Sequence, residues 1–291
     1  MPLLRQRVLC DCKGDTAAPV GGMKGFDRLL MVGCGNMAGA MLQGLLAAGA
    51  APARFTVADP SPLELPAGVR KLDAIPGEGE FDAILLGVKP QSLAAVAPQV
   101  EPLAGPGTVV VSILAGVELA VLEGHFPRAA GLVRLMPNLA AALGKSPIAV
   151  ATRGLGEAGR GAAIDWLVPL GTPEWIGEEE FDLVTALAGS GPAFVYRFID
   201  ALAAGSAELG LPADKARRLA LAMVEGSAAL AAASPHDPGE LARRVASPGG
   251  VTQAGLDALD EGGSLQRLIE ETLRAARDRS AEMAAEARRK G

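Results

Sequence analysis

The chain has 291 residues, of which 49% are hydrophobic, with a net charge of −6 and three cysteines. This length corresponds to one large domain or two ordinary ones, and the negative charge argues against nucleic-acid binding, which usually requires a basic face. No apolar run is long enough to suggest a membrane span, and so few cysteines do not form a disulfide framework, so we expect a reducing, cytoplasmic compartment.

The first 27 residues differ from the rest of the chain, because they combine mixed charges with two cysteines and show no hydrophobic period. We expect residues 1–27 to form a disordered extension, since they lack the apolar segment and cleavage site of a secretory signal. An alternative is that translation starts at Met23. Cys10 and Cys12 are two thiols without further ligands, so we expect no metal site.

Residues 28–177 alternate short apolar runs with helical segments. Continuous apolar runs are typical of strands buried on both faces of a parallel sheet. The expected strands are 28–33, 54–58, 83–88, 108–113, 131–135 and 147–151, and 172–176 completes the set. The expected helices are 37–49, 91–100 and 156–169. This alternation predicts an α/β fold, a doubly wound domain of the Rossmann type.

Residues 178–291 carry no further strand pattern, and we expect an all-α domain. Prolines open the helices predicted over 192–209 and 212–233, while Asp237 and Glu240 resemble a capping box. A long helix is expected from Ser264 onwards. Alanine-rich helices bury little area each, at about 25 cal/mol per Å², so they make a poor isolated core. We therefore expect this half to pack against a second copy as a homodimer.

A glycine-rich motif of the form G-x-G-x-x-A follows the first strand and opens a helix. The first glycine allows a tight turn, the second lets the backbone approach a pyrophosphate, and the alanine keeps the helix close to the sheet. The helix N-terminus adds free N–H groups and a partial positive charge. The predicted dinucleotide contacts in this motif are Gly33, Cys34, Gly35, Asn36 and Met37.

Asp59 ends the second expected strand, where a carboxylate can accept the hydroxyls of the adenosine ribose of NAD. It would repel the 2′-phosphate of NADP by about 4 kcal/mol, for charges about 4 Å apart at an effective dielectric of about 20. No cation follows before Arg70 and Lys71, so we expect a preference for NADH. The alternative is that Asp59 forms a solvent-facing turn with Pro60.

Two more loops follow strands at the carboxyl edge of the sheet, where ligands of open α/β sheets bind. One contains Val88, Lys89 and Pro90, and the other contains Ala115 and Gly116. The proline forces Lys89 into extended geometry, and its ammonium faces either the nucleotide or solvent. We expect both loops to contact the dinucleotide through their backbones.

The segment Ser247-Pro248-Gly249-Gly250-Val251-Thr252 interrupts the helical half. Its glycines let bare N–H groups approach a carboxylate, and each hydrogen bond to a charged group contributes roughly 1.5–3 kcal/mol, against about 0.3–1 kcal/mol from a helix dipole. A hydroxyl at Thr252 can bond a ring nitrogen, or it simply caps a helix. Ser190, within 188–194, either caps the next helix or faces the site.

Together these motifs closely resemble the pyrroline-5-carboxylate reductase family over about residues 28–280. The matching segments are VGCGNMAGAMLQGLL, LLGVKPQ, SILAGV, RLMPNLAAALGKSPIAV, ALAGSGPAFVYRFIDALAAGSAELGLP and RRVASPGGVTQAGLDALD. The resemblance implies a Rossmann domain followed by a dimerising helical domain, often with five dimers in a decamer. It also implies hydride transfer from NAD(P)H to the C=N bond of 1-pyrroline-5-carboxylate, giving L-proline in the last step of proline biosynthesis.

The same resemblance implies roles for individual residues. Thr252 corresponds to the threonine that contacts the ring nitrogen, and it is the expected catalytic residue. The substrate carboxylate is expected at the backbone around Gly249 and Gly250, with Ser247 and Ser190 as further substrate contacts. Two departures leave cofactor preference and site detail open. Residues 70–77 lack an asparagine that some members use to hold the nucleotide, and Leu-Ala replaces Thr-Pro after the Met-Pro-Asn at 136–138.

Two other readings compete with this one. A β-hydroxyacid dehydrogenase would share the architecture but needs a helical lysine, and the second half offers only Lys215 and Lys290. Neither His125 nor His236 sits in a context that suits a dehydrogenase base. A non-catalytic regulator that binds nucleotide or vitamin B6 would not need both the glycine-rich motif and the S-P-G-G-x-T segment.

Overall fold

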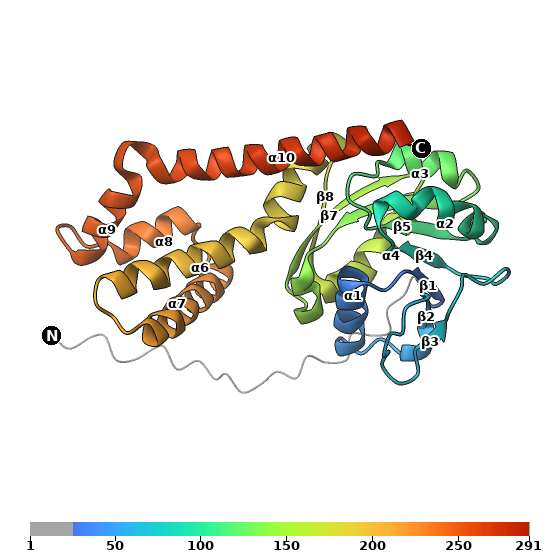
Figure 1. Cartoon of the computed structure of the whole chain (residues 1–291), viewed down its shortest axis with the longest axis horizontal. Coiled ribbons are helices and arrows are strands. Elements are labelled where there is room, and N and C mark those ends of the chain that lie inside the picture. Colours follow the sequence, from blue (N-terminus) through green and yellow to red (C-terminus); the bar gives the residue numbers. More distant parts are fainter. Residues whose placement is uncertain (1–25, 291) are drawn as a thin grey trace.

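The computed structural model describes residues 26–290 and has a β-sheet at one end and a group of helices at the other (Figure 1). The eight strands lie in the order β3-β2-β1-β4-β5-β6-β7-β8, and the first six repeat the order of a Rossmann fold. They are β1 (Leu29–Val32), β2 (Phe55–Ala58), β3 (Arg70–Leu72), β4 (Ala83–Leu86), β5 (Val109–Ser112), β6 (Gly131–Met136), β7 (Ser146–Arg153) and β8 (Gly171–Trp175). The predicted doubly wound domain and the helical region after it are confirmed.

Two features of the sheet differ from the sequence-based expectation. Strand β3 was not predicted, because it is a three-residue edge strand with the sequence Arg-Lys-Leu. Strand β7 was expected to be parallel, but it runs antiparallel to β6. A parallel connection needs a crossover of about a dozen residues or more, and only residues 137–145 separate β6 from β7.

Helices cover both faces of the sheet and bury two separate apolar clusters. One cluster contains Met41 and Leu45 of α1 (Asn36–Ala47) and Trp166 of α4 (Glu157–Leu167). The other contains Leu93 of α2 (Leu93–Val100) and Leu122 of α3 (Leu119–His125). Since every residue of β1, β4, β5 and β6 is buried, the central strands are covered on both sides, as their continuous apolar runs predict.

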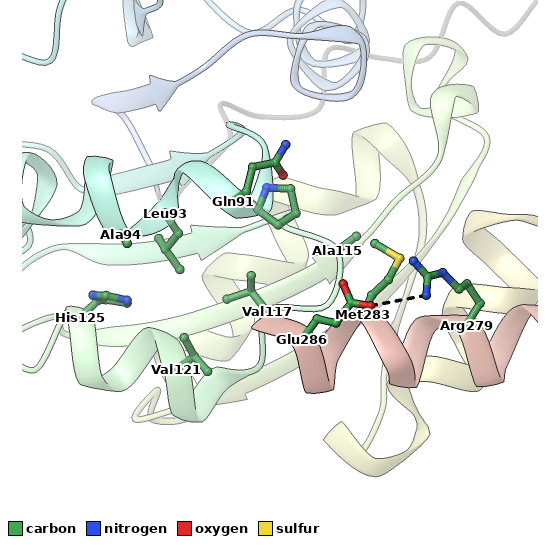
Figure 2. Close-up of a pocket in the computed structure, with 11 residues that line it drawn as sticks. Gln91, Leu93, Ala94, Ala115, Val117, Val121, His125, Arg279, Met283 and Glu286 are labelled. Carbon is green, nitrogen blue, oxygen red and sulfur yellow. Dashed lines mark ion pairs between the residues drawn. The ribbon is translucent and has the colours of Figure 1, made fainter. Parts of the chain in front are cut away.

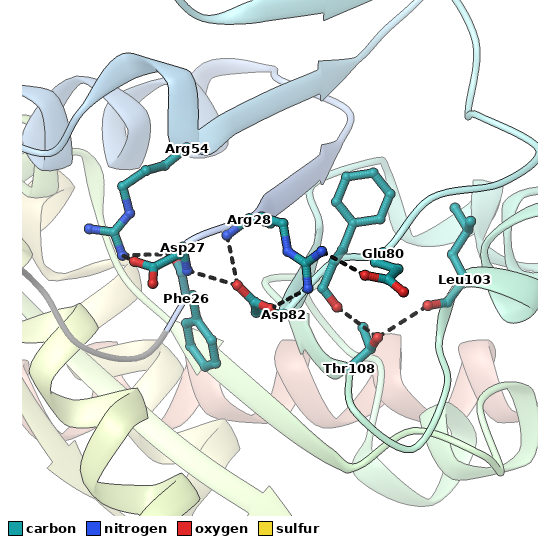
Figure 3. Close-up of polar contacts among 9 residues, drawn as sticks. Phe26, Asp27, Arg28, Arg54, Glu80, Asp82, Leu103 and Thr108 are labelled. Atoms are coloured by element: carbon teal, nitrogen blue, oxygen red, sulfur yellow. Dashed lines mark hydrogen bonds and ion pairs between the residues drawn. The ribbon is translucent and has the colours of Figure 1, made fainter.

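The folded domain begins before the first strand. Phe26 is only 5% exposed, and its ring packs edge-on against Trp166 at 5.6 Å. The backbone N–H groups of Asp27 and Arg28 donate to the Asp82 carboxylate at 3.0 and 2.9 Å (Figure 3). The expectation of disorder over residues 1–27 is therefore wrong for its last two residues, which the core and this carboxylate hold. The expectations for Cys10, Cys12 and Met23 lie outside the described residues.

After β8 the chain is helical, as expected. A short helix α5 (Phe181–Val184) continues through the π-helical turn η7 (Thr185–Gly189) into α6. The others are α6 (Gly191–Glu208), α7 (Ala213–Ala233), α8 (Pro238–Val245), α9 (Val251–Asp260) and α10 (Ser264–Lys290). Asp237 caps α8 by accepting the Glu240 N–H at 2.9 Å, whereas the Glu240 side chain pairs with Arg243 and Arg244 instead of completing a capping box. Helix α10 runs back along the molecule to the sheet (Figure 1).

The helical half has a thin core. Within residues 26–290, the buried residues of the cluster that α6 and α7 share are Ala203, Ala216 and Ala220. Large apolar side chains lie outside it instead, with Leu209 91% and Val251 93% exposed. Three alanines bury little apolar area, so α6 and α7 leave most of their apolar surface without a partner in the single chain. Nowhere in the described chain is there a helix with the length and hydropathy needed to cross a membrane.

Candidate active site

The turn between β1 and α1 is held tightly against the end of β4. Gly33 has φ +83°, and a Cβ there would lie 2.9 Å from the backbone nitrogen of Val88. A Cβ on Gly87 would lie 2.9 Å from the Cβ of Ala38. Gly33 and Gly87 are therefore required by close packing, and Ala38 brings α1 to the sheet as predicted. Gly87 was not singled out from the sequence, although a glycine at the end of an apolar strand indicates such an approach.

The N-terminus of α1 is open to a ligand. Gly35 is its N-cap with no side-chain hydrogen bond, and the first turn carries no acidic residue. A Cβ on Gly35 would meet no atom within 4 Å, so the space beside Gly35 is open. Asn36 is exposed and Met37 is half-buried against the core. Unpaired N–H groups and the helix dipole suit an anion, so the pyrophosphate of a dinucleotide fits this turn.

Cys34, the middle residue of this turn, is buried with 7% exposure. Burial, together with the charge of Asp59, raises the pKa of its thiol to about 11. The thiol is therefore neutral at physiological pH and contributes no charge to the turn. Its backbone N–H, in contrast, donates a hydrogen bond to the Asp59 carboxylate.

Asp59 is 8% exposed and connects two loops. One carboxylate oxygen accepts the Cys34 N–H at 2.8 Å, and the other accepts the Ser61 N–H at 2.8 Å. Burial opposes ionisation, but the hydrogen bonds from Cys34 and Ser61 outweigh it and lower the pKa of Asp59. The carboxylate is thus turned toward the protein, so the alternative of a solvent-facing turn is wrong. Contact with a ribose remains a prediction.

Lys71 lies far from Asp59 in the sequence, but strand pairing places it next to β2, the strand that Asp59 follows. Strand β3 pairs with β2 so that Lys71 lies opposite Val57, and the Asp59 N–H donates to the Leu72 carbonyl at 3.0 Å. The Lys71 ammonium is near enough to help lower the pKa of Asp59, and it forms an ion pair with Asp73. No sequence signal pointed to this pairing, because β3 has no apolar pattern.

The loops after β4 and β5 lie near each other beside α10. Lys89 is exposed, with the extended backbone (φ −71°, ψ 144°) that Pro90 imposes. Gly116 is buried, with φ +74°, and a Cβ there would lie 3.2 Å from the backbone nitrogen of Ala284 in α10. The glycine at 116 is therefore required by its backbone conformation and by the close approach of α10. Val88 and Ala115 are half-buried.

A cavity of about 270 Å³ adjoins these loops, between α2, α3 and α10 (Figure 2). Pro90 and Ala115 line it on one side, and Met283 lines it from α10. Arg279 and Glu286 form an ion pair at its edge, with 3.6 Å between nitrogen and oxygen. None of the residues Gly33 to Met37 lines the cavity, so the glycine-rich turn is not part of it.

Polar contacts made by Arg134 and Asn138 are among those that join the sheet domain to the helical half. The buried Arg134 guanidinium donates to Glu178 at 2.9 Å and lies 3.7 Å from the centroid of the Phe181 ring. Burial lowers the pKa of Arg134, although Glu178 opposes that shift. The Asn138 side chain, from the Met-Pro-Asn motif, donates to the Ala188 carbonyl at 2.9 Å. Neither contact was predicted, since each joins residues far apart in the sequence.

The structure tests the capping alternatives for Ser190 and for the S-P-G-G-x-T corner, defined as residues 247–252, while their contacts with substrate stay predictions. Ser190 is the N-cap of α6 but makes no capping hydrogen bond with its side chain, so the capping alternative is wrong. Thr252 is exposed and is the second residue of α9, whose N-cap is Gly250, so Thr252 is not an N-cap either. Gly249 has φ +67°, a conformation that favours glycine.

The corner differs from the expectation in one detail. The Gly250 N–H donates to the Ser247 carbonyl at 2.9 Å and closes the turn, so it is already used. The first intrahelical bond runs from the Ala254 N–H to the Gly250 carbonyl. The first-turn amides of α9, which begins at Val251, have no intrahelical partner and are therefore available as donors to a carboxylate.

The single chain does not bring its two predicted binding regions together. The glycine-rich turn precedes α1, whereas the corner precedes α9, and Figure 1 shows these helices at opposite ends of the molecule. Each region has its own helix N-terminus without a side-chain cap, and in the single chain these two helix starts lie far apart.

Comparisons with known proteins find matches to both the sheet domain and the helical half of the chain. Residues 178–283 match the family described as pyrroline-5-carboxylate reductase dimerisation, and residues 28–116 match the family described as NADP oxidoreductase coenzyme F420-dependent. Over 265 residues the chain is 35% identical to pyrroline-5-carboxylate reductase from Pseudomonas aeruginosa, covering 88% of this chain and 97% of that protein. Over 183 residues it is 39% identical to the Aquifex aeolicus protein of the same name, covering 62% and 68%.

A solved structure extends the similarity to three dimensions. The pyrroline-5-carboxylate reductase from Coxiella burnetii superposes with a TM-score of 0.82 at 27% identity, covering 89% of this chain and 98% of that one. The resemblance seen in the sequence motifs is therefore confirmed over nearly the whole length of the Pseudomonas aeruginosa and Coxiella burnetii proteins. The chain belongs to the pyrroline-5-carboxylate reductase family.

Proposed function

We propose that the chain reduces 1-pyrroline-5-carboxylate to L-proline with NAD(P)H, at a site that a second copy completes. The observation that carries this proposal is the pair of uncapped helix N-termini on one chain. Gly35 caps α1 and Gly250 caps α9, and neither helix start has a side-chain cap or an acidic first turn. One suits the pyrophosphate of a dinucleotide and the other suits the carboxylate of a small imino acid.

The nucleotide end of the site is formed by the β1–α1 turn and the loops after β4 and β5. The amides at the start of α1 hold the pyrophosphate, while the backbones of Val88, Lys89, Pro90 and Ala115 border the rest of the dinucleotide. When bound, NAD(P)H supplies the hydride. The protein has to hold this cofactor and the substrate in contact and exclude competing orientations.

The substrate end is the corner. First-turn amides of α9 bind the carboxylate, and the Thr252 hydroxyl, on the same turn, holds the ring nitrogen. A protonated imine is already electrophilic, so no strong acid is required at its carbon. The charged residues closest in sequence, Arg243 and Arg244, are paired with Glu240 at 2.9 and 2.8 Å, so they are partly neutralised.

A homodimer through the helical half accounts for both the geometry and the exposed surface. The corner of one chain then reaches the nucleotide end of its partner, and the apolar faces of α6 and α7 become buried. Burying them recovers the area that the three-alanine core lacks. Assembly of five such dimers into a decamer, which the family resemblance implies, is not needed to complete a site. We place the reaction in the cytoplasm, since the chain has few cysteines.

A complementation experiment tests the shared site directly. Gly35→Asp puts a negative charge at the start of α1 without a clash, because Gly35 has φ −69° and open space around it. This variant and Thr252→Ala should each have at most about one tenth of wild-type activity in a spectrophotometric assay with pyrroline-5-carboxylate and NAD(P)H. Unfolded together and refolded as a mixture, they should regain about one quarter of wild-type activity, since half of the dimers are mixed and each mixed dimer has one intact site.

The outcomes separate the alternatives. No recovery from two folded, dimeric variants would mean that both ends of a site come from one chain. Cofactor oxidation by the wild type only with 2-hydroxy or 2-oxo acids would favour a β-hydroxyacid dehydrogenase, and binding without turnover would favour a regulator. The basis for an NADH preference is weaker than the sequence suggests, because both Asp59 oxygens already accept hydrogen bonds.

A further inference from the structure

The end of β2 is where the adenosine ribose binds in Rossmann domains, and the charge found there decides between NADH and NADPH. In this chain the nearest acid, Asp59, is 8% exposed and bonded through both oxygens to backbone amides. Part of its charge is therefore already compensated inside the protein. A carboxylate in this state offers little surface to ribose hydroxyls and repels a 2′-phosphate less than a free one does.

A cation lies beside the same place. Strand β3 forms the edge of the sheet next to β2, with Lys71 in register with Val57 and Leu72 in register with Ala58, the residue before Asp59. The Asp59 N–H donates to the carbonyl of Leu72, the residue after Lys71, which holds β3 against this end of β2, and the positive charge of Lys71 is among the effects that lower the pKa of Asp59. Its side chain is 28% exposed, so it is accessible while part of its stem is packed.

The current partner of Lys71 is easy to replace. Asp73, which pairs with it, is 88% exposed. Ion pairs with such an exposed partner contribute little to stability, because water competes for the charged groups. A phosphate monoester carries about −1.5 to −2 charges and three acceptor oxygens, so it attracts an ammonium more strongly than one solvated carboxylate does.

We propose that Lys71 binds the 2′-phosphate of NADPH and that the chain therefore prefers NADPH to NADH. This inference rests on the proposed dinucleotide site and reverses the preference expected from Asp59 in the sequence. It gives a role to a lysine that lies twelve positions after Asp59 in the chain but opposite Val57, near the end of the strand that Asp59 follows.

The test is a binding titration that does not depend on turnover. NADPH and NADH are titrated against the purified protein by cofactor fluorescence, with displacement by adenosine 2′,5′-bisphosphate or by AMP as a second readout. The wild type should bind NADPH at least tenfold more tightly than NADH. Lys71→Ala should weaken NADPH about tenfold and NADH less than twofold, and Lys71→Arg should restore most of the preference.

Two matched variants sharpen the result. Arg70→Ala removes the same charge from the preceding residue of β3, whose side chain points to the opposite face, so it should leave the preference unchanged. Asp73→Asn releases Lys71 from its ion pair and should strengthen NADPH binding two- to fivefold.

Equal weakening of both cofactors by Lys71→Ala, or a wild-type preference for NADH, would overturn the assignment. So would an equal effect of Arg70→Ala, since that would indicate a general field rather than a contact. The proposed function fails separately, through absence of pyrroline-5-carboxylate reduction while the protein still binds dinucleotide.

Discussion

Asp59→Asn is the most informative single substitution in the nucleotide domain, because it keeps the shape of the side chain and removes its charge. Asp59 holds the Cys34 and Ser61 amides at 2.8 Å each, so we interpret it as a residue that positions the glycine-rich turn. An asparagine has one acceptor oxygen, so it can keep only one of these bonds. The NH₂ group of the asparagine would then face the second backbone N–H, that of Cys34 or Ser61, and two donors cannot bond each other.

The cost follows from these two hydrogen bonds. Each bond to a charged group contributes roughly 1.5–3 kcal/mol, and a neutral replacement contributes about 0.5–1.5 kcal/mol. We therefore expect Asp59→Asn to lower the free energy of unfolding by about 2–4 kcal/mol. For a chain of this size about 1 kcal/mol corresponds to a shift of about 2–4 °C in Tm, so Tm should fall by about 5–15 °C.

The pH dependence provides a second check. The folded state lowers the pKa of Asp59, so the ionised carboxylate stabilises the fold above its unfolded value of about 3.9. This contribution is lost as the pH falls through the lower folded value. The Tm difference between wild type and Asp59→Asn should therefore be constant near neutral pH and shrink in acid below about pH 4.

Thermal unfolding by circular dichroism measures the stability, and fluorescence titration measures the affinities for NADPH and NADH. Displacement of the turn should weaken both cofactors by a similar factor and leave their ratio within about twofold. A shift toward NADPH of tenfold or more, with little change in Tm, would refute this reasoning and make Asp59 a reader of the ribose. Tenfold corresponds to about 1.4 kcal/mol.

Three further predictions concern other parts of the chain. Thr252→Ala should lower kcat at least tenfold in the reductase assay with an unchanged Kd for NADPH; unchanged kinetics would remove Thr252 from the mechanism. Deletion of residues 1–22 should leave turnover and Tm as they are, and an insoluble product would show that this segment is structural. Gly44→Ala should destabilise by about 1–3 kcal/mol, because its Cβ would lie 2.1 Å from the Ala141 carbonyl oxygen. In the same helix, Gly39→Ala places its Cβ no closer than 3.9 Å to its neighbours and should stabilise by up to about 1 kcal/mol. Equal Tm values for these two variants would contradict the packing argument.

Some of the site follows from local sequence alone. Gly33 and Ala38 mark the turn into α1, and the apolar runs around them mark buried parallel strands. Asp237 before a proline and three residues ahead of Glu240 marks the start of α8. These features are readable because hydrophobic period, glycine and proline act within a few residues along the chain.

Other features came only from the tertiary structure. Strand β3 forms by hydrogen bonding to the free edge of β2. This pairing brings Lys71 opposite Val57, near the end of β2. The inward turn of the Asp59 carboxylate depends on an amide at Cys34, on a different loop. The antiparallel direction of β7 depends on how few residues connect it to β6.

The sequence by itself determined the fold class, most of the elements in their order, and the places of the glycine-rich motif and the S-P-G-G-x-T corner. Only the tertiary structure decided which way Asp59 points, which cation lies beside it, and that the S-P-G-G-x-T corner is remote from its own glycine-rich turn. The physical reason is that motifs and hydrophobic periods reflect interactions between residues that are close together in the chain. Strand pairing and the placement of a long helix such as α10 join residues that no local pattern relates.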